Sequence, residues 1–278
     1  MGIYRKFPTI FGNQAWDLEG EALYNQPAPP LRSRYILNMR VDASNYADSV
    51  SRVLGWASRG ESRYVCCANV HSVMESFDDP QFRSCINGAD LVTSDGMPLV
   101  WALRRLGVSE AARVYGPDLV PAVLRAADRE GLRVGFYGGT PNTLKLLSEN
   151  TGREYPGLVG YEFSPPFRDL SPEEDQMIVD RINASGVQIL FIGLGCPKQE
   201  RWMAEHKHRV HAVMLGVGAA FDFLTGVKPQ APHWLQSAGL EWLFRFAVEP
   251  KRLWRRYLKQ NPRFVAHFAA QLLTLKQS

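Results

Sequence analysis

The regular alternation of short apolar runs with amphipathic stretches constrains the fold of this chain more than any other feature. The runs are continuously apolar instead of alternating with polar residues, which is typical of parallel strands buried on both faces. Strands are predicted over 35–39, 63–68, 89–94, 132–138, 157–162, 187–195 and 211–218. Helices are predicted over 44–57, 70–77, 79–86, 98–106, 116–131, 140–150, 171–186 and 197–208. The pattern predicts an α/β fold: a mostly parallel, Rossmann-like sheet with helices on both faces.

Several helix ends carry recognisable boundary residues. Thr140–Pro141 and Ser171–Pro172 each place a capping hydroxyl before a proline in the first helical position. Gly131 and Gly186 follow the last apolar positions of two helices, where glycine favours termination.

The chain of 278 residues divides into three parts. Residues 1–34 are rich in Pro, Asn and Gln and are expected to form a poorly ordered extension. Residues 35–235 form the α/β core, and 236–278 a helical appendage. From Leu240 onward eight Lys and Arg stand against two acids, Glu241 and Glu249, although the whole chain carries only +4. This asymmetry indicates a negatively charged partner near the C-terminus.

The sequence favours a cytoplasmic protein. Its N-terminus lacks the long apolar stretch of a signal peptide, and no apolar run reaches the ~18–20 residues of a membrane span. Cys66 and Cys67 lie in an apolar run, and no cysteine pair has the C-x-x-C spacing. We therefore expect four reduced thiols and, at most, peripheral contact with a membrane.

Five polar, glycine-bearing turns follow predicted strands, at 68–72, 94–98, 138–142, 193–200 and 216–226. Ligands of open parallel sheets bind at the carboxyl ends of the strands, so these turns predict a single cleft, although each alone could be only a tight turn. Glycine turns that open helices suit a diphosphate, but none has the dinucleotide or P-loop pattern. The predicted nucleotide- and sugar-binding residues are Gly139, Thr140, Gly193, Gly195, Lys198, Gly216, Gly218 and Asp222.

Asp95 is the candidate catalytic base, because it follows a predicted strand and a carboxylate there could deprotonate an acceptor hydroxyl. The alternative is a helix N-cap. Asn69 and Gln199 lie in neighbouring turns and could hold sugar hydroxyls. Arg113 could pair with phosphate or orient the carboxylate, or could be an exposed surface residue.

A metal site is not expected. His206, His208 and His211 cluster loosely, but no nearby Cys or acid completes a ligand set, and no D-x-D motif occurs. The sequence therefore favours metal-free chemistry without a cofactor.

Aromatic and basic residues interleave over 242–259, where Arg245, Arg252 and Arg255 alternate with Trp and Tyr. This composition suits the headgroup region of an anionic membrane. It would also suit nucleic acid or a solvated helical face. A nucleic-acid binder would leave the glycine-lined turns unexplained, so no nucleic acid partner is expected.

The segments ADLVTSDGMPLVWALRRLG, ARVYGPDLV, FYGGTP, IGLGCPKQE and GVGAAFDFLTG, in this order, resemble the WecG/TagA/CpsF family of glycosyltransferases over about residues 35–260. The resemblance implies inverting, metal-independent transfer from a UDP-sugar to a polyprenyl-diphosphate-linked acceptor. The sugar would be N-acetylmannosamine, its uronic acid or glucose. It also implies a peripheral enzyme at the inner face of the cell membrane, with a homo-oligomer left open.

The resemblance assigns the base to Asp95 and the pocket to Asn69, Arg113 and Gln199. It implies that the appendage arginines, Arg245, Arg252 and Arg255, meet the diphosphate. Cys67 departs from the family pattern, in which many members have Thr two residues before the pocket Asn. A non-catalytic nucleotide-binding domain is the main alternative, and it would bind UDP without transferring a sugar.

Overall fold

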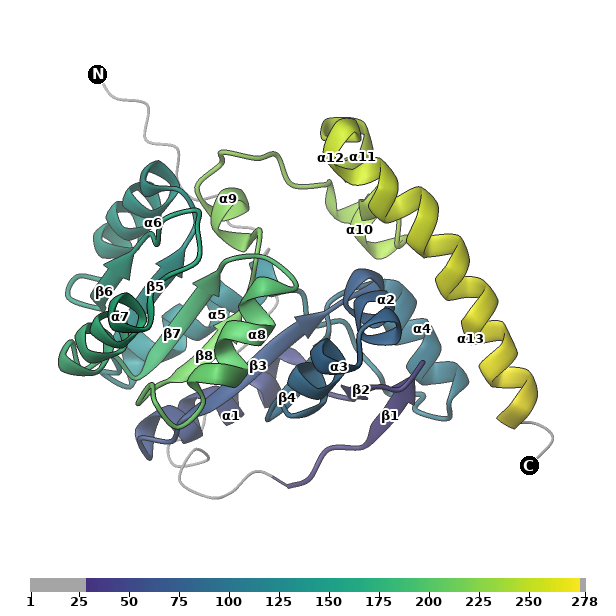
Figure 1. Cartoon of the computed structure of the whole chain (residues 1–278), viewed down its shortest axis with the longest axis horizontal. Coiled ribbons are helices and arrows are strands. Elements are labelled where there is room, and N and C mark those ends of the chain that lie inside the picture. The colour runs from purple at the N-terminus through teal and green to yellow at the C-terminus, as the bar shows by residue number, and fades with distance from the viewer. Residues whose placement is uncertain (1–28, 276–278) are drawn as a thin grey trace.

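The computed structural model describes residues 29–275, and a six-stranded parallel sheet lies at its centre (Figure 1). The strands are β3 Arg63–Ala68, β4 Leu91–Ser94, β5 Val134–Gly138, β6 Val159–Phe163, β7 Ile189–Gly193 and β8 Val213–Gly216. Their order is β4-β3-β8-β7-β5-β6, and every neighbouring pair is parallel. The predicted α/β class with a Rossmann-like sheet is confirmed.

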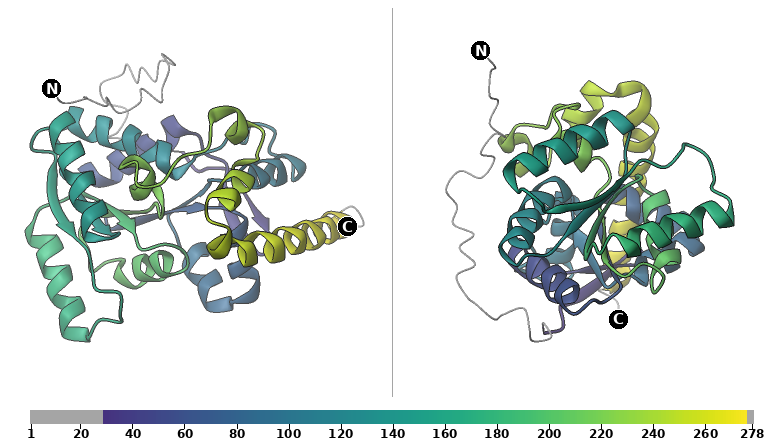
Figure 2. Two further views of the ribbon diagram at one scale, coloured as in Figure 1. Left: turned by 90° about the horizontal axis from the view of Figure 1, so that it is seen from above. Right: turned by 90° about the vertical axis from the view of Figure 1, so that its left-hand side faces the viewer.

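Each face of the sheet carries its own apolar core, because successive strand residues point to opposite sides. In β3, Cys66 packs into one core and its neighbours Val65 and Cys67 into the other. The first core is covered by α2 Val70–Asp78, α3 Pro80–Asn87, α4 Met97–Arg105, α7 Pro172–Ala184 and α8 Lys198–His206. The second is covered by α1 Tyr46–Ser58, α5 Gly116–Arg129, α6 Pro141–Glu154 and α9 Ala220–Leu224 (Figure 2).

The predicted boundary residues act as expected. Thr140 and Ser171 cap α6 and α7 by accepting hydrogen bonds from the N–H groups of Thr143 and Glu174. Gly131 and Gly186 adopt φ values of 65° and 68° just after α5 and α7, a left-handed conformation that glycine adopts without strain.

The prediction of a single strand over 35–39 was wrong. The chain forms an antiparallel hairpin there, with β1 at Ser33–Ile36 and β2 at Met39–Asp42, apart from the main sheet. Leu37 and Asn38 both have positive φ, which closes a two-residue turn inside the apolar run. The hairpin includes residues 33 and 34, which were expected in the N-terminal extension. The prediction of poor order also covered residues 1–28, which lie outside the described residues.

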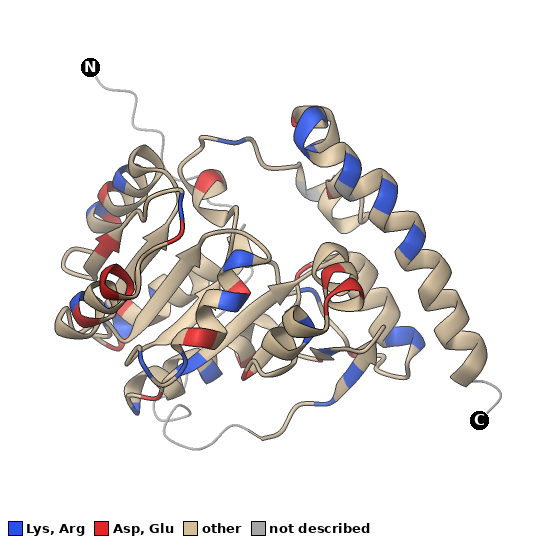
Figure 3. Cartoon of the chain, viewed as in Figure 1, with Lys and Arg blue, Asp and Glu red and all other residues tan. Residues whose placement is uncertain are grey.

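The C-terminal part of the chain is helical, as predicted. It contains α10 His233–Ser237, α11 Glu241–Val248, α12 Pro250–Trp254, the π-helix η1 Arg255–Gln260 and α13 Asn261–Leu275. The last three elements form one long rod that passes α2 and α4 (Figure 1). Lys and Arg residues are spaced along its first half (Figure 3).

Hydrogen bonds fasten the rod to α2 and to the hairpin. Arg263 donates two hydrogen bonds of 2.7 and 2.8 Å to the carboxylate of Asp78 on α2. Gln271 bonds to the hairpin through the N–H of Leu37 and the carbonyl oxygen of Tyr35. Within residues 29–275, no helix has both the length and the apolar character needed to span a bilayer.

Candidate active site

All five turns singled out in the sequence meet at the carboxyl end of the parallel sheet. They line one cleft of about 940 Å³, in the size range of sites for small organic ligands. Residues from every turn contribute, and the predicted set Asn69, Asp95, Gly139, Thr140, Gly193, Gly195, Lys198, Gln199, Gly216, Gly218 and Asp222 is found on its walls. The convergence predicted from the positions of these turns after parallel strands is therefore confirmed.

The glycines of these turns serve close packing. A Cβ atom on Gly138 would lie 2.7 Å from the backbone of Gly193, and one on Gly193 would lie 2.5 Å from the ring of Phe221. A Cβ atom on Gly216 would lie 2.6 Å from the terminal methyl group of Met203. Side chains at these positions would push the turns apart, so glycine keeps the floor of the cleft compact.

The expectation that these turns offer their backbone N–H groups to a diphosphate needs correction at three positions. The N–H of Gly139 donates to the carbonyl oxygen of Gly193, and that of Gly195 to Oε1 of Gln199. The N–H of Gly218 donates to the carbonyl oxygen of Ile192. The first turns of α6 and α8, and cationic side chains, are left to hold an anion. Lys198 is exposed at the first position of α8 and lines the cleft.

Asp222 joins the cleft wall to the start of the appendage. Its carboxylate accepts a 3.4 Å hydrogen bond from the hydroxyl of Thr143 on α6. It also pairs with the ammonium of Lys228 at 2.7 Å, and Lys228 reaches Glu249 at 3.5 Å. Asp222 therefore orders the segment that leaves the core.

Asn69 and Gln199 have structural partners as well as positions on the cleft. Asn69 is the N-cap of α2, and its side-chain oxygen accepts from the N–H of His71. Gln199 is buried beneath the Gly216–Gly218 turn and donates to Glu200 at 2.9 Å. The predicted role of these two amides in holding sugar hydroxyls stays a prediction.

Asp95 lies where β4 meets the cleft. Its Oδ1 accepts a 2.7 Å hydrogen bond from the N–H of Gly116, the first residue of α5. The N-cap of its own helix α4 is Gly96, which has no side-chain capping bond. Asp95 is therefore a capping residue for a helix 21 positions further along the chain, and not for the helix that it precedes.

The surroundings of Asp95 weaken its acidity. Burial raises the pKa of its carboxyl from 3.8 to about 6, and the Glu241 carboxylate adds to this effect. Arg113, the Gly116 N–H and Arg245 act in the opposite direction. A carboxylate with a pKa of about 6 is ionised at neutral pH and is a better proton acceptor than an ordinary aspartate.

Arg113 is neither an exposed residue nor an open phosphate ligand. Its Nε donates a 2.7 Å hydrogen bond to the backbone carbonyl oxygen of Asp95. Its terminal nitrogens contact Gln236 at 3.3 Å and form an ion pair with Glu241, both from the appendage. Its guanidinium also stacks 4.0 Å from the ring centroid of Tyr115. Arg113 thus joins the appendage to the core beside Asp95.

The three appendage arginines have different positions relative to the cleft. Arg245 and Arg252 line the cleft. The Nε of Arg245 is buried and has no hydrogen-bond partner in the described part of the chain, so it can donate to an anion bound in the cleft. Arg252 pairs with Glu249 at 2.5 Å. Arg255 is exposed beside Trp254 and borders neither cavity at the site.

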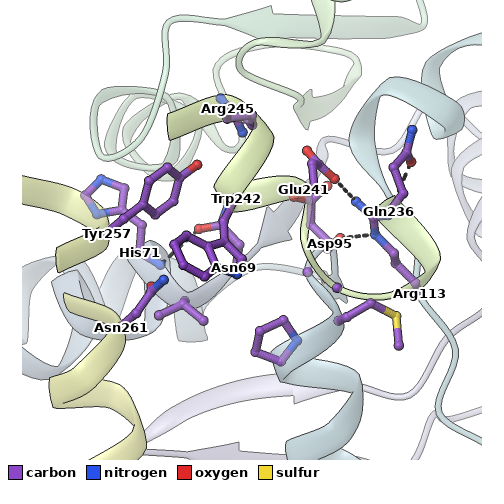
Figure 4. A pocket seen from close by; sticks show the side chains of 15 residues that line it. Asn69, His71, Asp95, Arg113, Gln236, Glu241, Trp242, Arg245, Tyr257 and Asn261 are labelled. Atoms are coloured by element: carbon purple, nitrogen blue, oxygen red, sulfur yellow. Dashed lines mark hydrogen bonds and ion pairs between the residues drawn. The ribbon is translucent and has the colours of Figure 1, made fainter. Parts of the chain in front are cut away.

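A second, smaller pocket of about 90 Å³ lies between the core and the appendage (Figure 4). Asn69, Asp95 and Arg245 border both this pocket and the large cleft. The remaining polar and aromatic wall comes largely from residues that sequence reasoning did not place in the site: His71, Gln236, Glu241, Trp242, Tyr257 and Asn261. One signal was available, because Glu241 is one of only two acids in a strongly basic segment.

In the part of the chain that the structure describes, the histidines that were candidates for a metal site do not face a common centre with other ligands. The ring nitrogens of His206 lie 2.7 Å from the carbonyl oxygen of Trp202 and 2.9 Å from the carboxylate of Asp175. His211 is exposed. Across residues 29–275, no three His, Cys, Asp or Glu side chains gather as a metal site would require.

Cys67 is buried on the cleft side of β3, close to Asp95. Burial raises the pKa of its thiol, and the negative charge of Asp95 adds to the effect. The thiol therefore stays protonated and is a poor nucleophile.

Comparison with known proteins identifies the family. The profile of the Glycosyl transferase WecG/TagA/CpsF family matches residues 34–278. The chain is also similar to the N-acetylglucosaminyldiphosphoundecaprenol N-acetyl-beta-D-mannosaminyltransferase of Bacillus spizizenii. The two are 29% identical over 213 residues, which cover 76% of this chain and 80% of that protein. The chain therefore belongs to the WecG/TagA/CpsF family and is a glycosyltransferase.

Proposed function

We propose that this glycosyltransferase moves a sugar from a UDP-sugar to a saccharide linked to a polyprenyl diphosphate. The observation that carries the proposal is the position of Asp95. Its carboxylate borders the glycine-lined cleft on one side and the pocket beneath the appendage on the other. Donor and acceptor entering from these two sides would meet at a group that can accept a proton.

In the proposed reaction, Asp95 accepts the proton of the acceptor hydroxyl as its oxygen attacks the anomeric carbon of the donor. The bond from that carbon to the diphosphate breaks, and UDP leaves with the bonding electrons. A single displacement inverts the anomeric configuration. It needs one base and no covalent intermediate, and among the described residues Asp95 is the acid that borders both cavities.

The departing diphosphate gains negative charge, which the site can neutralise with the protein's own groups. Arg245 presents an unpartnered Nε, and Arg252 and Lys198 border the same cleft. The first turns of α6 and α8 add partial positive charge. These groups support transfer without a metal ion, since preorganised cations and dipoles supply the same stabilisation.

N-acetylmannosamine is the first donor sugar to test, because the relative from Bacillus spizizenii is named for its transfer. That relative acts on N-acetylglucosaminyldiphosphoundecaprenol, which makes an undecaprenyl-diphosphate saccharide the first acceptor to test. N-acetylmannosaminuronic acid and glucose are the other two proposed donors.

We place the reaction at the inner face of the cell membrane, where a polyprenyl-linked acceptor would lie. The appendage exposes the apolar side chains of Trp234, Leu243, Trp254 and Leu258. Exposed Lys and Arg side chains lie among them, at Lys251, Arg252, Arg255 and Lys259. Such a surface suits peripheral attachment to anionic lipid. Flotation with phosphatidylglycerol vesicles, but not with phosphatidylcholine vesicles, would support it; equal flotation with both would contradict the electrostatic part.

The decisive experiment offers a panel of UDP-sugars with an undecaprenyl-diphosphate-linked N-acetylglucosamine acceptor and identifies the product by mass. The native enzyme should add one sugar from one donor of the panel. Asp95→Asn should lose most turnover, about 10²–10⁴-fold, and still bind UDP. Asp128→Asn, an exposed change on α5, is the matched control. Full activity in Asp95→Asn would remove Asp95 from the role of base.

A further inference from the structure

The contacts of Arg113 contain an unexpected arrangement. An arginine beside a carboxylate ordinarily pairs with it, in two parallel hydrogen bonds where geometry allows. Arg113 lies next to Asp95 but bonds to its backbone carbonyl oxygen instead. Within residues 29–275, no hydrogen bond joins the Arg113 guanidinium to the Asp95 carboxylate. Both terminal nitrogens of the guanidinium bond to appendage side chains, Gln236 and Glu241.

Glu241 is fixed from two directions. One carboxylate oxygen pairs with Arg113, and the other accepts a 2.8 Å hydrogen bond from the hydroxyl of Tyr115. The side chains of Arg113 and Glu241 are only 16% and 14% exposed, so solvent weakens their attraction little. Tyr115 is itself held by Tyr46, whose hydroxyl oxygen accepts from the Tyr115 N–H at 3.0 Å. The pair is therefore a rigid junction between α11 and the core.

We infer that Glu241 is a positioning residue that holds the Arg113 guanidinium away from the Asp95 carboxylate and so keeps Asp95 free to accept a proton. The inference rests on the proposed function of Asp95 as the base. Because Glu241 belongs to α11, the packing of α11 on the core determines whether Arg113 is paired and so affects the charge on Asp95. Without Glu241, the Arg113 charge would act on Asp95 uncompensated.

The charges around Asp95 determine the direction of the effect. Arg113 and Arg245 lower the pKa of its carboxyl, and Glu241 raises it. Uncharged dipoles matter too, because the Gly116 N–H stabilises the ionised form. The titratable or charged groups that border the small pocket with Asp95 are His71 of α2, Arg113, Glu241 and Arg245 of α11, and Tyr257 of η1. Cys67 of β3 and Tyr115 also interact with the Asp95 charge. Removing Glu241 takes away a negative charge that opposes the two arginines at Asp95.

The test is a carboxyl titration that needs no catalysis. The full-length protein labelled with ¹³C at the aspartate carboxyl carbons is titrated by NMR, and the Asp95 signal is identified by its loss in Asp95→Asn. In the native protein its midpoint is expected near 6. In Glu241→Gln the midpoint should fall by about one pH unit, and in Arg113→Gln it should rise. Glu249→Gln, which removes the other appendage acid, should leave it in place.

Either single change leaves a buried charge without its partner and could unfold the junction. The double variant Glu241→Gln with Arg113→Gln removes both charges and should titrate near the native midpoint. An unchanged midpoint in Glu241→Gln, or a double variant that titrates well away from the native protein, would overturn the inference. The pH profile of turnover separates this outcome from the proposed function. If the NMR midpoint moves and the acid limb of the rate does not follow, Asp95 is not the base although Glu241 controls its charge.

Discussion

The Oδ1 atom of Asp95 lies 2.7 Å from the backbone nitrogen of Gly116 and accepts its hydrogen bond. The carboxylate therefore faces the positive end of α5, which stabilises its charge, while burial disfavours that charge. Burial prevails, and the pKa rises from 3.8 to about 6. The cleft thus contains a carboxylate whose ionisation costs folding free energy.

The first prediction concerns stability and pH. Because the folded state raises the pKa, it holds a proton that the unfolded state has released between about pH 4 and pH 6. The favourable contribution is complete below pH 4 and is lost as pH rises through 6. Asp95→Asn should therefore be more stable than the native protein at pH 8, by roughly 1–2 kcal/mol, and not at pH 4. Urea unfolding at both pH values measures this difference.

Asp128→Asn on the exposed side of α5 is the control for exchanging an aspartate for an asparagine. A loss of stability in Asp95→Asn at pH 8 would mean that the bond to Gly116 outweighs the cost of the buried charge.

The second prediction compares how much each appendage arginine contributes to donor binding. Arg245→Ala should raise the KM for the donor about 10- to 100-fold, because a charge-assisted hydrogen bond contributes about 1.5–3 kcal/mol. Arg252→Ala should raise it less, since Arg252 is half-exposed and already paired with Glu249. Arg255→Ala should leave it unchanged, because that side chain borders neither cavity. Initial rates at varied donor concentration measure all three, and equal effects would contradict the placement.

The third prediction concerns metal removal. If cationic side chains and helix N-termini stabilise the leaving diphosphate, turnover should persist in excess EDTA. Adding Mg²⁺ should change the rate by less than about twofold, because no step depends on it. A rate that disappears with EDTA and returns with Mg²⁺ would contradict metal-independent transfer. Arg245→Ala assayed in both conditions is a further control, since a metal could compensate for the missing cation.

Local sequence signals predicted most of the fold. Strand and helix positions followed from apolar periodicity, and Thr140 and Ser171 start helices through bonds that span only three residues. The hairpin was missed because Ile36, Leu37 and Met39 are all buried, so the run reads as one strand. The turn depends on the backbone conformation of Leu37 and Asn38, which a Gly in that place would have indicated.

The site was predicted less completely, because its decisive contacts join distant parts of the chain. The rim of the cleft followed from the five turns that come after parallel strands, and Asp95 followed from its position after one of these strands. The Arg113–Glu241 pair links residues 128 positions apart, and no local pattern indicates it. The only indication in the sequence was Glu241 itself, one of two acids in a strongly basic segment. Predicting such a pair requires knowing how the appendage packs on the core.

The fourth prediction tests the floor of the cleft. Gly193→Ala should destabilise the protein by about 1–3 kcal/mol, because its Cβ would lie 2.5 Å from the buried ring of Phe221. Gly216→Ala should cost less, since it meets the flexible end of Met203. Gly152→Ala is the control: it lies within α6 with open space around it, so alanine should stabilise by about 0.5–1 kcal/mol. Thermal melts rank the three, and a native melting temperature for Gly193→Ala would contradict the close approach.

The last prediction assigns the pocket beneath the appendage to the acceptor. Trp242 borders this pocket and not the large cleft, and its indole lies among polar side chains that include His71 and Asn261 (Figure 4). An aromatic face beside hydrogen-bonding groups suits the apolar face of a pyranose ring. Trp242→Ala should therefore raise the KM for a water-soluble, short-chain acceptor about tenfold and leave UDP affinity unchanged. Trp254 is half-exposed and lies outside the pocket. Trp254→Ala should therefore change neither the acceptor KM nor the UDP affinity in this assay, because no membrane is present. If Trp242→Ala weakens UDP binding instead, the pocket belongs to the donor, and the acceptor must approach Asp95 from the large cleft.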